Sequence, residues 1–377
     1  MVFARVVYAL NWMNVGAIFY LMNTDLNGGV SGLGTLTSAF YLGIGLLQVP
    51  GGLLAAKWGP KRVVVIGIFV FSLGALGTSV VSTIAEMTAL RFLVGGGMAF
   101  VFAPGIVIIA QLLRGGKSGI GVGLFNSAYD LGGLVALFGW VVVAIATGWR
   151  ISLALSGGLG ILTGIFALVF VPRDQPSAEF AVSAGPLMNI LKDRRLIFVG
   201  LTMLGFDVGN TIISGFMIFY LESEFGVSGT FAGAVTSLVT IVPIFAALWA
   251  GRIYDRVLKH RRIMVITILA SALSLALGAY HSILAAVACS ALGGVVSGIG
   301  YTFAFAGARD FNREGKEYET LAISWVNSIH LTGSFIPPVL FSTLVEMLGY
   351  PQAWMWCAAV TLVFLIPLVG LAERWGR

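Results

Sequence analysis

Apolar runs of about 20 residues follow one another along the whole chain, separated by short polar segments. A helix of roughly 20 apolar residues crosses the ~30 Å hydrocarbon core of a bilayer. The pattern predicts twelve membrane-spanning helices near residues 5–22, 33–56, 63–84, 87–112, 118–146, 151–171, 196–221, 229–250, 263–280, 283–306, 319–345 and 352–371. We therefore expect an all-α membrane protein.

Composition excludes a soluble globular domain, because 58% of the residues are hydrophobic and only 10% are charged. Only Arg5 precedes the first apolar run, and no cleavage site of small residues follows it, so we interpret this run as a retained helix rather than a signal peptide. Cys289 and Cys357 both lie inside predicted spans, which argues against a disulfide framework.

Basic residues indicate the orientation, since Lys and Arg accumulate on the cytoplasmic side of membrane proteins. With a cytoplasmic amino terminus, only Arg91 and Arg150 of the 22 Lys and Arg residues fall outside the inner loops and the two ends. The sequence thus predicts a multi-pass protein of the plasma membrane with both termini in the cytoplasm. The net charge of +6 follows from this topology, and we expect no nucleic-acid partner.

The two halves of the chain repeat each other. IFYL occurs at 18–21 and 218–221, GVSG at 29–32 and 226–229, and NSAYDLG at 126–132 corresponds to NSIHLTG at 327–333. These matches keep their order at offsets of 197 to 201 residues. They predict two pseudo-symmetric bundles of six helices in the same orientation, at 1–171 and 196–377, joined by a cytoplasmic linker at 172–195.

The loops after the second helix of each half carry a recognisable motif. GLLAAKWGPKR at 52–62 has paired glycines and a Lys/Arg cluster but Ala56 at the acidic position, whereas GRIYDRVLKHRR at 251–262 keeps Asp255. With RFLVGGG at 91–97, these elements resemble the signature of the major facilitator superfamily (MFS) over essentially the whole chain. The resemblance implies the MFS fold and secondary transport, without identifying a subfamily.

Polar side chains inside membrane helices are costly and mark candidate functional positions. Four ionisable residues lie deep in the predicted spans, namely Arg91, Asp130, Asp207 and His330, and asparagines accompany them on the same helix faces: Asn11, Asn14, Asn126, Asn210 and Asn327. The glycines at 95–97 and 293–294 lack the strand and Lys of a phosphate-binding loop, so we expect close helix packing or a hinge there. Pro50, Pro104 and Pro243 suggest bends.

Depth suggests how the ionisable groups pair. Asp130, Asp207 and His330 lie about 16–18 Å from the cytoplasmic ends of their helices, near the bilayer midplane. A carboxylate facing an imidazole suits proton coupling, which we assign to Asp207, His330 and Asp130. The alternative is that His330 only hydrogen-bonds Asn327 or a backbone carbonyl.

Arg91 allows two interpretations. It either binds an anionic substrate together with the asparagines, or forms a structural ion pair with Asp130 in the neighbouring helix. Taken singly, the asparagines are as well suited to joining helices as to binding a solute.

The cytoplasmic motifs suggest an inner gate. Asp255 would face the start of the fifth helix near Ser118, and the basic cluster of the first copy would face acids at the start of helix 11. The gate prediction comprises Asp255, Arg256, Lys57, Lys61, Arg62, Glu317 and Glu319, with enforcement of topology as the alternative role of the basic cluster.

These features predict a secondary transporter that moves a small solute by alternating access, with proton coupling and with a small organic anion or polar metabolite favoured as substrate. A proton-coupled drug exporter is the main alternative, although the Gly-Pro signature of many exporters is missing from LFNSAYDLGGLVALFGW. A solute sensor without flux is an alternative of another class. We expect a monomer in the lipid bilayer, with no cofactor, no metal site and no enzymatic activity.

Overall fold

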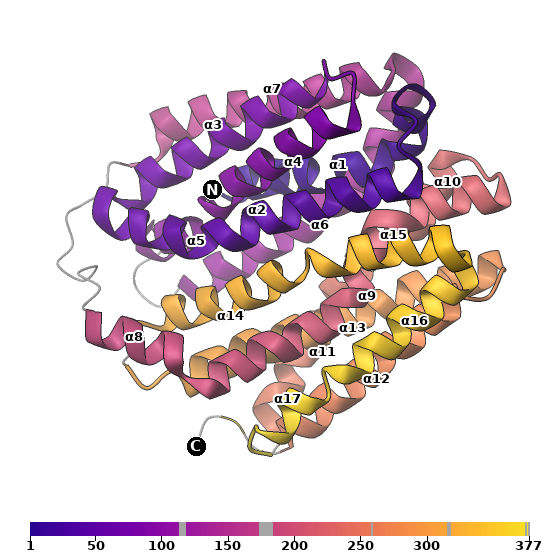
Figure 1. Ribbon diagram of the computed structural model, residues 1–377. Coiled ribbons are helices and arrows are strands. Elements are labelled where there is room, and N and C mark those ends of the chain that lie inside the picture. Colours follow the sequence, from indigo (N-terminus) through magenta and orange to yellow (C-terminus); the bar gives the residue numbers. More distant parts are fainter. Residues whose placement is uncertain (113–117, 173–183, 258, 315–317, 374, 376–377) are drawn as a thin grey trace.

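The computed structural model describes residues 1–112, 118–172, 184–257, 259–314, 318–373 and 375. Within these ranges the chain is helical and contains no strand (Figure 1). The helices are α1 (Val2–Leu26), α2 (Gly29–Trp58), α3 (Pro60–Thr78), α4 (Ile84–Ala99), α5 (Phe102–Leu112), α6 (Ser118–Thr147), α7 (Trp149–Phe170), α8 (Ala184–Lys192), α9 (Arg194–Phe225), α10 (Gly229–Thr236), α11 (Leu238–Arg256), α12 (His260–Gly278), α13 (Ile283–Phe311), α14 (Glu319–Gly333), α15 (Ile336–Leu348), α16 (Tyr350–Val363) and α17 (Ile366–Val369).

Twelve segments of the described chain are long and apolar enough to cross a membrane, which confirms the predicted number of spans. Four of these segments are interrupted, between α4 and α5, α10 and α11, α14 and α15, and α16 and α17. Proline accounts for three interruptions, because Pro104, Pro337 and Pro367 each lack the N–H that would continue the preceding helix. By contrast, α2 continues past Pro50, and Pro243 lies inside α11.

The spans form two six-helix bundles, as predicted. In Figure 1 the first bundle, α1 to α7, lies above the second, α9 to α17. Glycines allow equivalent helices to pack closely in both: a Cβ at Gly95 would lie 2.1 Å from the carbonyl oxygen of Phe40, and one at Gly294 would lie 2.7 Å from that of Leu238. The interpretation of these glycines as packing residues is confirmed. Helix α8, which the sequence did not predict, occupies part of the linker.

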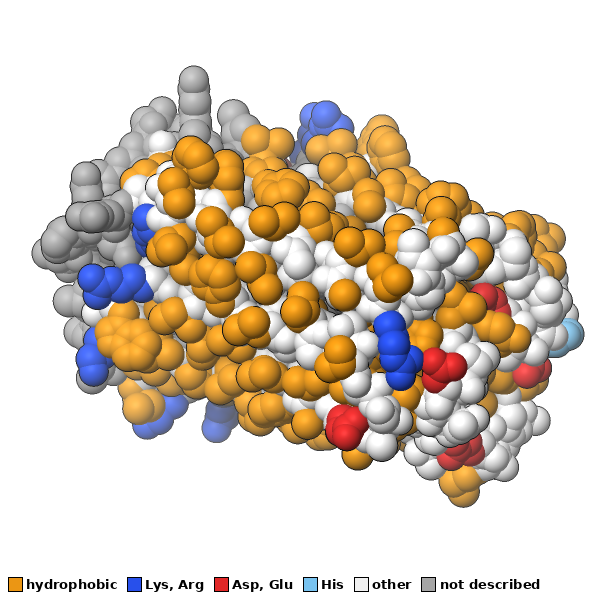
Figure 2. Space-filling view, turned by 90° about the horizontal axis from the view of Figure 1, so that it is seen from above, with side chains coloured by type: hydrophobic (Ala, Val, Ile, Leu, Met, Phe, Trp, Pro, Cys, Tyr) orange, Lys and Arg blue, Asp and Glu red, His pale blue; other side chains and the backbone are white. Residues whose placement is uncertain are grey.

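Charge divides the molecule into two ends, with apolar side chains over the surface between them (Figure 2). We call the end that carries Lys57, Arg62, Lys192, Arg256 and Arg262 the basic end, and the end that carries Asp25, Glu86, Glu222, Glu224 and Glu346 the acidic end. Arg150 lies at the acidic end and pairs with Asp25 at 2.9 Å.

Candidate functional site

The two bundles contact each other tightly in the half of the molecule toward the acidic end. Helices α1 and α9 approach at glycines, where a Cβ on Gly16 would lie 3.2 Å from the carbonyl oxygen of Gly215. Beyond this crossing, the rings of Phe19 and Phe219 lie 5.5 Å apart. The Ser38 hydroxyl donates to the carbonyl oxygen of Phe335 at 2.6 Å. The interface is therefore closed on this side.

Toward the basic end the same interface opens. On the face of α6 that meets the second bundle, Leu137 and Gly133 are buried, Asp130 is half-buried and Asn126 is exposed. Two glycines of the loop motifs, Gly52 of α2 and Gly251 of α11, also face open space. Among the described residues, a Cβ added to either would have no atom within 4 Å outside its own helix turn. At these positions of α6, α2 and α11 the bundles thus separate toward the basic end, whereas α5 and α14 stay in contact.

Asp207 lies near the middle of α9 with only 1% of its surface exposed. Its Oδ1 accepts hydrogen bonds from Tyr301 and from Asn210 at 3.3 Å. Its Oδ2 accepts one from the Thr211 hydroxyl at 3.1 Å and lies 2.9 Å from Ser334 Oγ. A buried carboxylate with donors on both oxygens is compensated for its lost hydration.

His330 completes this group, with its Nε2 atom 3.6 Å from Asp207 Oδ2 and 3% of its surface exposed. It lies on the last turn of α14, and Ser334 follows in the interruption before α15. Ser334 Oγ is 2.8 Å from the His330 carbonyl oxygen, so its single proton can serve either that oxygen or Asp207. The structure brings together Asp207 and His330, the pair that the sequence suggested.

One hydrogen bond connects this group to the first bundle. The Thr211 hydroxyl, which also contacts Asp207, lies 3.3 Å from the Tyr41 hydroxyl of α2. Behind Tyr41, Trp12 packs against Phe40 at 4.7 Å and against Tyr41 and Tyr129 at 5.6 Å between ring centroids. The second bundle thus offers an acid and an imidazole at the midplane, and the first bundle faces them with aromatic rings.

Arg91 does not pair with Asp130; among the described residues, no ion pair joins them. Its Nη1 donates to the Asn11 carbonyl oxygen and to Asn14 Oδ1, both at 3.3 Å, and its Nη2 donates to the Trp12 carbonyl oxygen at 3.2 Å. The interpretation of Arg91 as the partner of Asp130 is therefore wrong. The depth of Arg91 along its helix allowed a pair with Asp130, but the guanidinium contacts α1 instead.

Asn11 and Asn14 use their side chains between helices. Ser156 of α7 donates to Asn11 Oδ1 at 2.8 Å and accepts from Asn14 Nδ2 at 3.1 Å. Asn11 Nδ2 also donates to the carbonyl oxygens of Val7 and Ser156. Both residues are at most 1% exposed. Their contacts favour the joining of α1, α4 and α7 over substrate binding.

The remaining asparagines differ in their surroundings. Asn210 bridges Asp207 and Ser297, whose hydroxyl lies 3.3 Å from Asn210 Oδ1. Asn327 is buried one turn before His330. Asn126 is exposed on the open part of α6, one turn from Asp130. Binding of a solute by these three residues stays a prediction.

The predicted inner gate lies where the interface is open. Asp255, Arg256, Lys57 and Arg62 are exposed, and Lys61 donates to the carbonyl oxygen of Val171 in its own bundle. In the ranges that the structure covers, no ion pair crosses between the bundles at the basic end, and Glu319 is half-buried; Glu317 lies outside the described residues. The gate stays a prediction for a conformation closed at this end.

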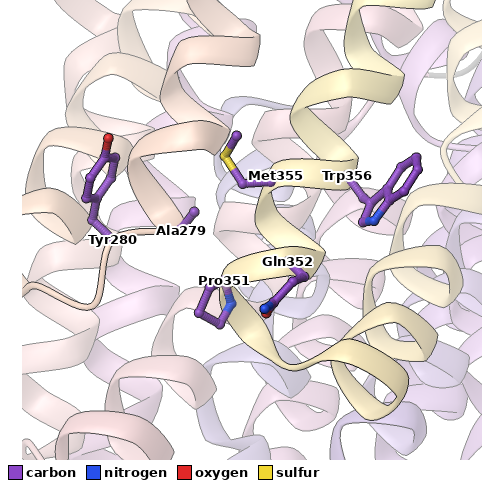
Figure 3. Close-up of a pocket in the computed structure, with 6 residues that line it drawn as sticks. All are labelled: Ala279, Tyr280, Pro351, Gln352, Met355 and Trp356. Atoms are coloured by element: carbon purple, nitrogen blue, oxygen red, sulfur yellow. The ribbon is translucent and has the colours of Figure 1, made fainter.

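A surface pocket of about 370 Å³ lies at the acidic end, between the end of α12 and the start of α16. It is lined by Ala279, Tyr280, Pro351, Gln352, Met355 and Trp356. Figure 3 shows Tyr280 and Trp356 on opposite sides of this group. The lining has no charged side chain and is separate from Asp207, so we do not assign the solute site to it. Among the described residues no cluster of His, Cys, Asp and Glu could hold a metal ion.

Several curated relatives are named as bacterial transporters of organic molecules. The chain is 28% identical over 200 residues to a probable actinorhodin transporter of Streptomyces coelicolor, covering 52% of this chain and 33% of the relative. It is 26% identical over 275 residues to the probable galactarate/D-glucarate transporter GudP of Escherichia coli, covering 63% and 61%. It is 24% identical over 250 residues to the hexuronate transporter of Bacillus subtilis, covering 62% and 58%. The chain thus spans between one third and about three fifths of these relatives.

The fold is also that of solved transporters. A D-xylose–proton symporter superposes with a TM-score of 0.79 at 13% identity, covering 100% of this chain and 97% of the symporter. The sequence model described as Major Facilitator Superfamily matches residues 1–209 and again residues 197–375, once for each bundle. The chain therefore belongs to the Major Facilitator Superfamily, as the motifs at 52–62 and 251–262 suggested.

Proposed function

We propose that this transporter moves a small organic acid together with protons, by alternating access of a midplane site between the two bundles. The observation that carries this proposal is the Asp207–His330 pair, 3.6 Å apart and almost fully buried in the middle of the membrane spans. In the proposed orientation the basic end is cytoplasmic, so the conformation described here faces inward.

Asp207 is suited to carry the coupled proton because its surroundings serve both protonation states. When ionised, it accepts from Tyr301, Asn210 and Thr211; when protonated, it can donate to a neighbouring oxygen or pass its proton to His330. Each change alters the bond that Thr211 shares with Tyr41 across the bundle interface. Proton binding thereby acts on the contact that must break or re-form when the bundles rock.

The organic acid is supported by two observations. Two relatives are named as transporters of galactarate/D-glucarate and of hexuronate, which are sugar acids with carboxylate groups. In the first bundle, Arg5 and Arg91 place buried positive charge on the side opposite Asp207. A proton that neutralises Asp207 would also lower the electrostatic cost of bringing an anion to the site.

Export of a flat aromatic compound is the second candidate function. The ring cluster of Trp12, Phe40, Tyr41 and Tyr129 and the relative named for actinorhodin favour it. Such a solute would stack on the rings and would not require a cation.

Purified protein in proteoliposomes distinguishes these functions. We expect uptake of radiolabelled D-glucarate or D-glucuronate to follow an imposed pH gradient and to stop with a protonophore. Asp207→Asn should remove the response to the gradient but preserve counterflow, which needs no net proton movement. Gradient-driven uptake that is equal in Asp207→Asn would refute the proton site. Transport of an aromatic dye with no acid uptake would establish the second candidate.

A further inference from the structure

Arg5 is a buried cation whose hydrogen-bonding capacity is largely unused. It lies on the first turn of α1 with 7% of its surface exposed. Its Nε and Nη1 atoms are buried and have no hydrogen-bond partner, and no carboxylate of the described residues lies within 4.0 Å of its guanidinium. A buried charge whose donors lack acceptors is costly.

Four aromatic rings hold the guanidinium in place. Its central carbon lies 4.3 Å from the ring centroid of Tyr8, 4.6 Å from Tyr129, 4.8 Å from Phe102 and 5.2 Å from Phe125. Rings from α1, α5 and α6 attract the cation through their faces, and the Tyr8 hydroxyl adds a polar contact, while Nε and Nη1 find no acceptor. They position the arginine while leaving donors available.

Two other arginines of the described chain differ from Arg5 in having acceptors for their N–H groups. Arg91 is equally buried but also donates to Asn11, Trp12 and Asn14. Arg195 contacts both carboxylate oxygens of Asp193. Arg5 is surrounded by rings, and its Nε and Nη1 atoms have no acceptor.

The open part of the bundle interface borders Arg5. Tyr129, which stacks on Arg5, neighbours Asp130 on α6, and Asn126 is exposed one turn closer to the basic end. Toward the midplane, Tyr129 contacts Trp12, and Trp12 contacts Tyr41. Arg5 is therefore placed between the opening at the basic end and the Asp207 group.

We propose that Arg5 binds the carboxylate of the transported acid at a station on the basic side of the Asp207 group. This inference rests on the proposed transport of an organic acid. The guanidinium fork matches a carboxylate, and the surrounding rings can pack on the carbon skeleton of the solute. Asp130 follows Tyr129 on α6, so its carboxylate, when ionised, opposes binding of a further negative charge beside Arg5. The station therefore suits a single carboxylate group.

The test compares D-glucuronate with D-glucuronamide, which has the same skeleton without the charge. Dissociation constants are measured by titration calorimetry on the full-length protein in detergent. We expect wild type to prefer glucuronate roughly tenfold or more, because a buried arginine recognises the carboxylate by charge-assisted hydrogen bonds. In Arg5→Gln this preference should fall to about threefold or less, and Arg5→Lys should lie between them, since lysine keeps the charge but not the fork.

The ratio of two affinities in one protein does not depend on the fraction that is folded. If Arg5→Gln does not fold, Asp130→Asn supplies the second measurement: removing the opposing charge should strengthen glucuronate binding severalfold and leave glucuronamide binding unchanged. An unchanged preference in Arg5→Gln, or an unchanged glucuronate affinity in Asp130→Asn, would overturn the assignment. If wild type binds neither D-glucuronate nor D-glucarate, the proposed function fails together with this station.

Discussion

The two bundles share one architecture but present different chemistry to the interface between them. Tyr129 and His330 occupy equivalent places in the repeat, within NSAYDLG and NSIHLTG. In the second bundle the imidazole faces Asp207 at 3.6 Å. In the first bundle the phenol ring of Tyr129 stacks on Arg5 at 4.6 Å. The same position of the repeat thus contacts an acidic residue, Asp207, in the second bundle and a basic residue, Arg5, in the first.

This difference teaches how a repeated fold acquires a directional task. Helix packing has been kept in both copies, as the close approaches at Gly95 and Gly294 show. The polar groups have diverged, so that in our proposal one bundle holds the proton and the other holds the anion. Rocking of two such halves would bring opposite charges together or move them apart, which a symmetric pair of sites could not do.

The largest effect is expected from substituting His330, and the equivalent residue Tyr129 provides the comparison. His330→Gln should lower pH-driven uptake about 100-fold, because it removes the titratable partner of Asp207. Tyr129→Phe keeps the ring that stacks on Arg5 and should change uptake less than about threefold. Uptake into proteoliposomes under a fixed pH gradient measures both variants. Equal losses would show that the two bundles are not divided in the way we propose.

The sequence predicted the Asp207–His330 pair because both residues are rare inside membrane helices and lie at the same depth. It did not predict Tyr301, Thr211 or Ser334 as partners. Hydroxyl groups are common in membrane helices and often bond a carbonyl one turn earlier, as Thr302 does with Gly298 at 2.7 Å. No local pattern separates such a residue from Ser334, whose position depends on the interruption before Pro337.

The second prediction concerns Arg91, a residue of the first bundle that we now interpret as structural. Arg91→Gln should destabilise the protein by about 2–4 kcal/mol, because it removes three buried hydrogen bonds from a charged donor. Arg150→Gln is the control, since Arg150 is partly exposed and its solvent-screened pair with Asp25 should contribute little. Denaturant unfolding in detergent measures both.

A double variant sharpens this test. If Arg91 were paired with Asp130, Asp130→Asn would relieve part of the loss caused by Arg91→Gln. The contacts with α1 predict that the two changes are additive within about 0.5 kcal/mol. If Asp130→Asn partly reversed the destabilisation caused by Arg91→Gln, our interpretation would be wrong and Arg91 would be paired with Asp130.

Arg91 also shows the limit of depth as a guide. Counting residues from a helix end gives the height of a side chain, but the direction in which it points depends on which helices pack around it. The length of the apolar runs predicted the spans correctly, because this length is set by the thickness of the bilayer and not by the neighbouring helices. Helix α8 escaped prediction because it has only nine residues and no apolar run of membrane length.

The smallest effect is expected at the basic end, where the two copies of the loop motif differ. Asp255 is available to face the start of α6 in a conformation closed at this end, and Ala56 leaves the first copy without an equivalent. Asp255→Ala should raise the population that is open at the basic end by about two- to fivefold, since an exposed interaction of this kind contributes roughly 0–1 kcal/mol. Ala56→Asp should shift the population in the opposite direction, because it restores the acid to the first copy.

Spin labels on cysteines that replace Trp58 and Lys259, both exposed, would report the distance between the two bundles at the basic end. Cys289 and Cys357 are fully buried and need not be removed. Asp255→Asn is the matched variant, because it keeps the size of the side chain while removing the charge that a helix start attracts, and it should reproduce most of the effect of Asp255→Ala. A distance distribution that is the same in wild type, Asp255→Ala and Ala56→Asp would contradict the gate and would leave the basic residues of these loops with the single role of fixing the orientation in the membrane.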